Sequence, residues 1–247
     1  MTDHPSNFAI IVAGGSGQRM NNSRPKQFLL LDRLPVLMRT IHAFHRANSN
    51  PAIVVVLPSD WINYWTDLCY KFQFHVPHFI AEGGASRFQS VKMGLDFIST
   101  QISTQSLSGQ SGELKAGNLL PPLIAVHDGA RPLVSSALID ESFAMARSKK
   151  AVIPAIESTD SVRFSENGAH RVLPRNQVFL IQTPQTFHAD LLFKAYEQEE
   201  SPAFTDDATV VESMGETITL IEGDKTNLKI TTEDDLTLAS ALLELSK

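Results

Sequence analysis

The chain has 247 residues, of which 43% are hydrophobic and 19% charged, and its formal net charge is −6. This composition is typical of one large α/β domain with a substantial core, and the negative charge argues against a general nucleic-acid-binding protein. A single cysteine, Cys69, excludes a disulfide framework and a cysteine-based zinc site. No apolar run approaches the roughly 20 residues of a membrane-spanning helix and no signal peptide is visible, so we expect a soluble, cytoplasmic protein without membrane contact.

Short apolar runs alternate with helical patterns along the chain. The runs predict buried strands at 8–13, 52–57, 78–84, 122–128, 150–156 and 217–223. Apolar residues at helical spacing predict helices at 35–47, 60–72, 86–98, 136–148, 188–200, 205–215 and 232–245. Asp60 stands where it could cap the second of these helices.

Two segments depart from this alternation. Residues 101–119 are polar and without periodicity, which indicates a flexible surface insertion. Residues 158–182 contain alternating residues and an Asn-Gly pair at 167–168, which predict a hairpin or an extended arm. The whole pattern predicts a single Rossmann-like α/β domain over 1–247, with a mostly parallel twisted sheet and helices on both faces.

The glycine-rich stretch VAGGSGQRMNNSRPKQF, residues 12–28, follows the first predicted strand. A dinucleotide fingerprint would need a third glycine where Met20 stands, and a P-loop would need a Gly-Lys pair that is missing. Glycines allow backbone N–H groups to approach a phosphate chain, and Arg19 and Lys26 add two cations. Their charge suits a triphosphate in which negative charge builds on the α-phosphorus and on departing pyrophosphate.

The loop and PKQF, followed in order by HDGARP (127–132), DSVRF (160–164), QTPQTF (182–187), TDDA (205–208) and NLKIT (227–231), resemble the 2-C-methyl-D-erythritol 4-phosphate cytidylyltransferase family. The resemblance covers nearly the whole chain except 101–119. It implies a nucleotidyltransferase of the non-mevalonate isoprenoid pathway. In the family reaction, a substrate phosphate attacks the α-phosphorus of CTP in line and pyrophosphate leaves.

The resemblance also implies roles for individual residues. Arg19 and Lys26 would stabilise the transition state, with Arg175 and Lys229 as the other catalytic pair that aims the incoming phosphate. Nucleotide-binding residues would be Ala13, Gly14, Gly15, Gly17, Gly84, Ala85, Ser90, Asp128 and Gly129. Family members often carry an acidic residue where Ala85 stands. The polyol phosphate would be held by Ser161, Arg175, Thr183 and Lys229, with Arg131 nearby for ligand or structural pairing.

Asp128 is also the residue that would hold Mg²⁺, a hard cation that prefers oxygen ligands and accompanies phosphates. In the family the arm at 158–182 crosses to a second subunit, so that Ser161 and Arg175 would complete the partner's pocket. An extended hairpin is marginal alone in water, which also favours a homodimer with exchanged arms.

Two alternatives remain open at this point. Ribitol-5-phosphate cytidylyltransferases share the loop, PKQF and QTPQ, and their substrate is also a polyol phosphate. A non-catalytic nucleotide-binding regulator on the same fold would keep the glycines and lose the cations. Because Arg19, Lys26, Arg175 and Lys229 are all present, we favour the enzyme.

Overall fold

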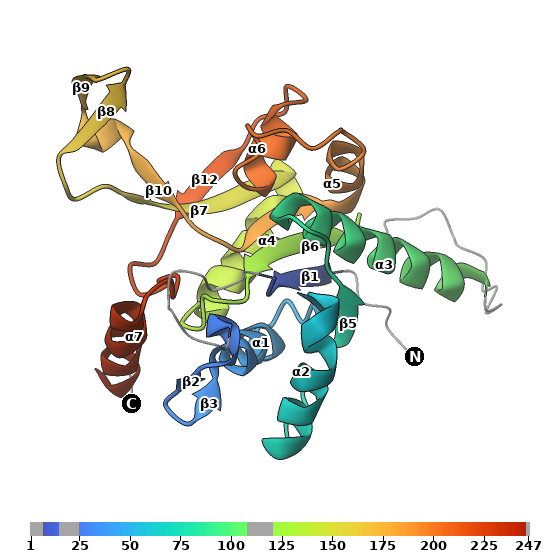
Figure 1. Ribbon diagram of the computed structural model, residues 1–247. Coiled ribbons are helices and arrows are strands. Elements are labelled where there is room, and N and C mark those ends of the chain that lie inside the picture. The colour runs from blue at the N-terminus through green and yellow to red at the C-terminus, as the bar shows by residue number, and fades with distance from the viewer. Residues whose placement is uncertain (1–6, 15–24, 108–120, 246–247) are drawn as a thin grey trace.

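The computed structural model describes residues 7–14, 25–107 and 121–245. Its main sheet has the strand order β10-β7-β11-β6-β1-β4-β5, with β12 also paired to β7 (Figure 1). The strands are β1 (Asn7–Val12), β4 (Ala52–Leu57), β5 (Phe79–Glu82), β6 (Leu123–Asp128), β7 (Ala151–Glu157), β10 (Phe179–Ile181), β11 (Gln185–His188) and β12 (Thr219–Glu222). Strands β5, β4, β1 and β6 run parallel, as does β12 with β7. The predicted mostly parallel α/β sheet is confirmed.

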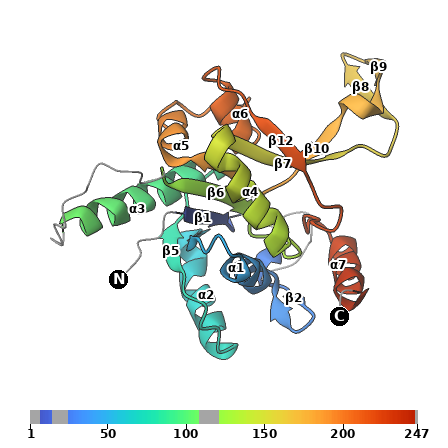
Figure 2. The ribbon, with the colours of Figure 1, turned by 180° about the vertical axis from the view of Figure 1, so that it is seen from behind.

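The helices cover both faces of this sheet. They are α1 (Val36–Arg46), α2 (Ser59–Lys71), α3 (Arg87–Leu107), α4 (Ser136–Lys149), α5 (Ala189–Ala195), α6 (Asp207–Glu212) and α7 (Glu233–Leu245). Side chains alternate along β1, so Ala9 and Ile11 pack with α1, α2 and α4, whereas Phe8 and Ile10 pack with α3, α5 and α6. Figure 2 shows α1 and α4 in front of the sheet.

Several predicted boundaries change. Helix α2 begins at Ser59 after Pro58, so Asp60 lies in its first turn and the prediction that Asp60 caps the helix is wrong. Helix α3 continues to Leu107, so 101–107 is helical rather than irregular, while the rest of the predicted insertion, 108–119, lies outside the described residues. Helices α5 and α6 are shorter than expected, at 7 and 6 residues; they pack against each other, and α5 also packs against β11 and β6.

Strand β11 has no counterpart among the predicted strands. It runs antiparallel to both of its neighbours, β6 and β7, and β10 on the other side of β7 is antiparallel as well. Its sequence QTFH is too short and too polar for a continuous apolar run, but Gln185, Thr186 and Phe187 are all buried. Tertiary packing therefore decides this strand, rather than local pattern.

The predicted arm contains a two-stranded hairpin that projects from the body (Figure 1). Strands β8 (Val162–Glu166) and β9 (Ala169–Leu173) are antiparallel and joined by Asn167 and Gly168, both with positive φ. This is the backbone that a two-residue hairpin loop of the Asn-Gly type requires. The last part of the predicted arm is different, because β10 pairs with β7 in the main sheet. The remaining short pair is β2 (Leu30–Leu31) with β3 (Leu34–Pro35).

Candidate active site

Lys26 begins a short 3-10 helix, Lys26–Phe28, and the two residues after it anchor that helix to the body. Gln27 is buried and its Nε2 donates to the Ala13 carbonyl at 2.6 Å. The ring of Phe28 lies 5.2 Å from Tyr64 and 5.5 Å from Trp61, both on α2. The segment that carries Lys26 is therefore fixed against the end of β1.

Gly84, Ala85 and Ser90 lie in the turn between β5 and α3 and in the first turn of α3. A Cβ atom on Gly84 would stand 2.4 Å from the Gln89 Cβ, so this close turn requires glycine. Gln89 Oε1 accepts from the Ala85 backbone N–H at 3.1 Å, and the Ser90 hydroxyl donates to the Ser86 carbonyl at 2.8 Å. These bonds hold the turn in shape, and Ala85, which lines the cleft, brings no carboxylate to it at this position.

Asp128, the last residue of β6, lies among three cations. Lys229 Nζ is 2.8 Å from its Oδ2, Arg131 Nε is 3.5 Å from the same oxygen, and Arg87 Nε is 3.7 Å from Oδ1. Burial alone would raise the pKa of Asp128, but these positive charges outweigh burial and hold the pKa well below its usual value. The carboxylate is thus ionised and presented at the edge of the sheet.

Thr183 and His127 lie directly behind Asp128. The Arg131 carbonyl can only accept, so His127 Nε2, at 3.3 Å, carries the proton and Nδ1 is an acceptor. The Thr183 hydroxyl therefore donates to Nδ1 at 2.9 Å and accepts from the Asp128 N–H at 3.2 Å. Burial lowers the pKa of His127 to about 3, so the ring is neutral near pH 7. Thr183 is buried, with its hydroxyl engaged on both sides inside the protein.

The loop that carries Lys229 is held by three polar side chains. Gln182 bonds to the backbone of Asp224 in both directions, at 2.8 and 3.1 Å, and Asn227 Nδ2 donates to the Thr183 carbonyl at 2.8 Å. Arg131 Nη1 donates to the Asn227 carbonyl at 2.7 Å. Arg131 thus contributes both to the loop and to the charge around Asp128.

One cleft brings most of the predicted nucleotide-side residues together. Its lining includes Ala13, Gly14, Lys26, Gly84, Ala85, Ser90, Asp128 and Lys229. Gly129 lies beside it, where its N–H donates to the Val12 carbonyl at 2.8 Å and a Cβ atom would stand 3.1 Å from that of Ala13. The predicted residues Gly15, Gly17 and Arg19 lie outside the described residues.

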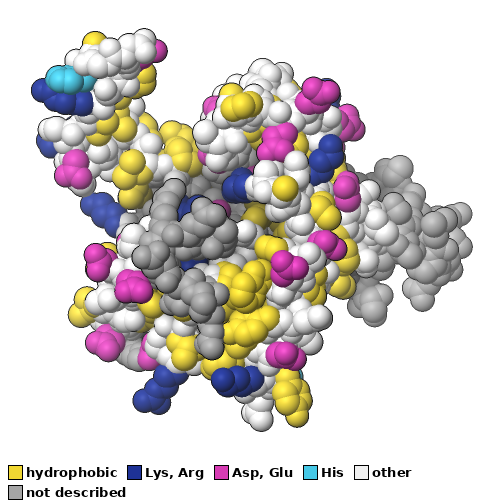
Figure 3. Space-filling model, in the orientation of Figure 1, with side chains coloured by type: hydrophobic (Ala, Val, Ile, Leu, Met, Phe, Trp, Pro, Cys, Tyr) yellow, Lys and Arg dark blue, Asp and Glu magenta, His cyan; other side chains and the backbone are white. Residues whose placement is uncertain are grey.

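Arg175 and Ser161, in contrast, are not among the residues that line this cleft. Both are exposed, and Arg175 lines a second hollow together with Ser158, Glu222 and Lys225, where the arm leaves the body. Figure 3 shows hydrophobic side chains gathered on the arm and at its base. The folded single chain therefore separates the predicted residues into a cleft set and an arm set.

The donor set of the cleft fits Mg²⁺ only in part. Within the described part of the chain, no group of three or more His, Cys, Asp and Glu side chains could enclose a metal ion. Mg²⁺ is commonly held by one or two carboxylates with substrate phosphates and water as the other ligands. The ionised Asp128 carboxylate can serve as that single protein ligand.

Among the described helices, none is long and apolar enough to cross a membrane.

Among the cleft residues that were not predicted from the sequence, Arg87 and Gln27 make structural contacts that shape the site. Arg87 lines the cleft and approaches Asp128, and Gln27 holds the Lys26 segment. Both lie next to predicted site residues, Arg87 two positions after Ala85 and Gln27 directly after Lys26, but their spacing in the sequence does not indicate a tertiary partner. The long separation between Arg87 and its partners explains why local pattern did not reveal it.

The protein-family model described as 2-C-methyl-D-erythritol 4-phosphate cytidylyltransferase matches residues 8–107 and 113–245. The gap between these matched ranges falls within the predicted insertion. A Bacteroides fragilis protein named 2-C-methyl-D-erythritol 4-phosphate cytidylyltransferase is 45% identical over 235 residues, covering 95% of this chain and 98% of that protein. A Geobacter metallireducens protein of the same name is 35% identical over 241 residues, covering 96% and 97%.

Solved structures agree with these relatives. The structure of 4-diphosphocytidyl-2C-methyl-D-erythritol synthase from Anaerococcus prevotii superposes with a TM-score of 0.74 at 28% identity and covers 96% of both chains. That of 2-C-methyl-D-erythritol 4-phosphate cytidylyltransferase from Thermus thermophilus gives 0.69 at 29% identity, covering 95% of this chain and 98% of that one.

Proposed function

The chain belongs to the 2-C-methyl-D-erythritol 4-phosphate cytidylyltransferase family, and from that premise we propose how its own residues carry out the reaction. The enzyme joins CTP and 2-C-methyl-D-erythritol 4-phosphate to give 4-(CDP)-2-C-methyl-D-erythritol and pyrophosphate. The observation that carries our assignment of roles is the single cleft in which Lys26, Asp128 and Lys229 meet at the ends of β1 and β6. In open α/β sheets, ligands bind in the crevice beyond the carboxyl ends of the strands.

The chemistry needs no general base, because the attacking phosphate oxygen is already ionised near neutral pH. The bond from this oxygen to the α-phosphorus forms as the bond to the pyrophosphate oxygen breaks. Lys26, with Arg19, offsets the negative charge that develops on the α-phosphoryl group and the leaving pyrophosphate. The turn with Gly84, Ala85 and Ser90 receives the cytosine. Since Ala85 has no carboxylate, backbone groups of the turn make the base contacts there.

Asp128 would hold Mg²⁺ together with phosphate oxygens, and the ion would supply further neutralisation of the triphosphate. The carboxylate is already ionised, so it is ready to bind a cation without releasing a proton. Gly14 lines the cleft without a side chain, which permits close approach of the triphosphate, and Gly129 would lie near the ribose with its backbone packed beside Ala13.

The second substrate is also an anion, so it must be drawn toward another phosphate. We assign this task to Lys229 from the cleft and to Arg175 from an arm of a second subunit. The Lys229 side chain is 41% exposed, which leaves its ammonium accessible to a phosphate. Ser161, on the same arm, would donate its hydroxyl to the polyol phosphate. Binding of the same substrate by Thr183 stays a prediction. Its hydroxyl already bonds to His127 and to the Asp128 N–H, so it would have to share these bonds with the substrate.

A homodimer with exchanged arms would unite the cleft set with the arm set. Its support is exposed apolar surface on the arm and where the arm joins the body: Phe164 on β8 is 44% exposed and Leu180 on β10 is 52% exposed. Such side chains need a surface to pack on. The charged substrates do not cross bilayers, which supports a cytoplasmic location for the enzyme.

The test of the activity is release of pyrophosphate from CTP with Mg²⁺ and either polyol phosphate. We expect turnover with 2-C-methyl-D-erythritol 4-phosphate to exceed that with ribitol 5-phosphate by at least about tenfold, since each unmatched buried polar contact reduces transition-state binding. Faster turnover with ribitol 5-phosphate would assign the chain to the alternative substrate. No pyrophosphate from either substrate would favour a non-catalytic nucleotide-binding protein.

A further inference from the structure

Asp207, the second aspartate of the TDDA motif, is a charged residue with no exposed surface. It is the first residue of α6, and its side chain is 0% exposed. An ionised carboxylate out of contact with water is strongly unfavourable unless it is paired and hydrogen-bonded. The partners of Asp207 therefore indicate why the residue is there.

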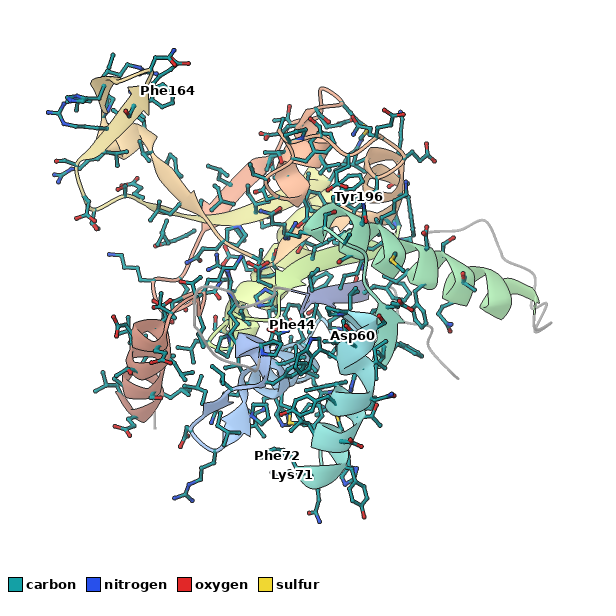
Figure 4. The ribbon with its side chains drawn as sticks, in the orientation of Figure 1. Phe44, Asp60, Lys71, Phe72, Phe164 and Tyr196 are labelled. Atoms are coloured by element: carbon teal, nitrogen blue, oxygen red, sulfur yellow. The ribbon has the colours of Figure 1, made fainter. Side chains whose placement is uncertain are left out.

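Those partners are Arg87 and Tyr196. Arg87 Nη1 and Nη2 lie 3.0 and 2.7 Å from the two carboxylate oxygens, which is a two-bond, fork-like pairing. The Tyr196 hydroxyl donates to Oδ1 at 2.6 Å. Tyr196 lies where α5, α6 and the start of α3 approach one another (Figure 4). Both oxygens of Asp207 are thus directed at Arg87, and the tyrosine fixes one of them.

Arg87 reaches the cleft with the rest of its guanidinium group. It is the first residue of α3, its side chain is 31% exposed, and its Nε lies 3.7 Å from Asp128 Oδ1. Lys229 and Arg131 contact the other oxygen of Asp128. The Asp128 carboxylate is therefore held from two sides, and Arg87 is the cation at Oδ1.

The chain of contacts Tyr196–Asp207–Arg87–Asp128 joins the C-terminal end of α5 and the start of α6 to α3 and to β6. An arginine side chain has several rotatable bonds, and about 2 kcal/mol of rotamer entropy opposes its fixation. Two bonds to Asp207 hold the guanidinium in one orientation. When the Lys229 ammonium turns to a substrate phosphate, Arg87 still holds Asp128 at Oδ1.

We propose that Asp207, supported by Tyr196, is a positioning residue that orients Arg87 against Asp128 and so sets the geometry of the reacting phosphates. The proposal rests on the proposed function, in which Asp128 acts at the nucleotide phosphates. Asp207 touches neither substrate. Its effect passes through Arg87, so its loss changes the turnover of correctly folded enzyme.

The test measures kcat and both KM values for Asp207→Asn, which keeps the shape of the side chain and removes its charge. We expect kcat to fall on the order of tenfold to a hundredfold, as for a misplacement of about 1 Å in a reacting group.

Tyr196→Phe removes one hydroxyl and should reduce kcat about threefold. In an Arg87→Lys background, which has lost the forked pairing, Asp207→Asn should have little further effect, and this non-additivity shows that it acts through Arg87.

Asp206→Asn is the matched control. Asp206 caps the same helix and its carboxylate pairs with Gln185, but it does not contact Arg87. Its kcat should stay within about twofold of wild type, whatever its thermal stability. Either of two results would overturn the proposal: a wild-type kcat in folded Asp207→Asn, or the same fold-loss from Asp207→Asn in the wild type and in the Arg87→Lys background. If Asp207→Asn does not fold, an unchanged kcat in Tyr196→Phe overturns it. The wild type in the same assay separates this outcome from failure of the proposed function, which would leave the wild type itself inactive.

Discussion

At the scale of single residues, the short contacts around Lys26 and Asp128 explain why this cleft is ready to bind a triphosphate. Gln27 ties the Lys26 segment to the Ala13 carbonyl, and the Thr183–His127 pair ties the Asp128 backbone to the sheet. Each bond uses a buried polar group that would otherwise be unsatisfied. Neutral residues, as well as charged ones, therefore hold Lys26 and Asp128 in position.

Replacing Gln27 tests this placement. Gln27→Leu keeps much of the volume but leaves the buried Ala13 carbonyl without its side-chain donor, so we expect a loss of about 1–3 kcal/mol in the free energy of unfolding. The kcat should also fall, because Lys26 is no longer anchored. Denaturant unfolding and steady-state kinetics provide the two measurements. Unchanged values of both would show that Gln27 does not hold the segment.

A second residue-scale prediction concerns His78. Its Nδ1–H donates to the Val76 carbonyl at 2.7 Å and its Nε2 accepts from Trp65 Nε1 at 3.0 Å. Burial lowers its pKa, so below about pH 6.5 the unfolded chain binds a proton that the native ring resists. Stability contributed by neutral His78 is therefore complete above that pH and is lost as the pH falls.

The measurement is the free energy of unfolding at pH 7 and at pH 5. We expect His78→Gln to reduce the loss of stability on acidification, by at most about 1.4 kcal/mol per pH unit for one group. His75→Gln, at an exposed position in the same loop, is the control and should behave like the wild type. An identical pH dependence in His78→Gln would exclude this source of acid sensitivity.

At the scale of elements, the β8–β9 hairpin is the segment on which the proposed homodimer most directly depends. Its turn needs positive φ at Asn167 and at Gly168, where φ is 82°. Beyond its chain neighbours, no atom lies within 4 Å of a Cβ placed on Gly168, so an alanine there would meet no steric clash. Its effect would come from the lower preference of alanine for a positive φ. A left-handed backbone disfavours residues other than glycine by about 1–2 kcal/mol.

Gly168→Ala should therefore weaken the hairpin and, with it, the dimer. We expect specific activity to fall at low enzyme concentration and to recover at high concentration, because association restores the arm's partner. Gly215→Ala is the matched control, since Gly215 has φ of 83° and equally open surroundings but follows α6 rather than lying in the arm. Concentration dependence in both variants, or in neither, would contradict the role of the hairpin.

At the scale of the whole molecule, the separation of Lys26 in the cleft from Arg175 on the arm predicts sites shared between subunits. Mixing two inactive variants, Lys26→Ala and Arg175→Ala, should restore activity after subunits exchange. Half of the dimers would be mixed, and one of their two sites would be intact, so about a quarter of the wild-type activity should return. No recovery despite confirmed subunit exchange would mean that each chain supplies its own arginine.

Much of this arrangement could be predicted from the sequence, because strand ends and glycine loops have local signals. The apolar runs located β1, β4 and β6, and the Asn-Gly pair located the β8–β9 turn. What local pattern could not reveal depends on tertiary partners. Strand β11 is stabilised by burial, and the pairing of Arg87 with Asp207 joins residues 120 positions apart.

In the proposed mechanism Lys26 acts on the transition state of cytidylyl transfer rather than on binding of CTP. The most direct test compares wild type and Lys26→Ala by pyrophosphate release and by calorimetric titration with CTP. We predict a loss of at least about a hundredfold in kcat, while CTP still binds with a measurable affinity. A Lys26→Ala enzyme that retains its turnover would contradict the claim.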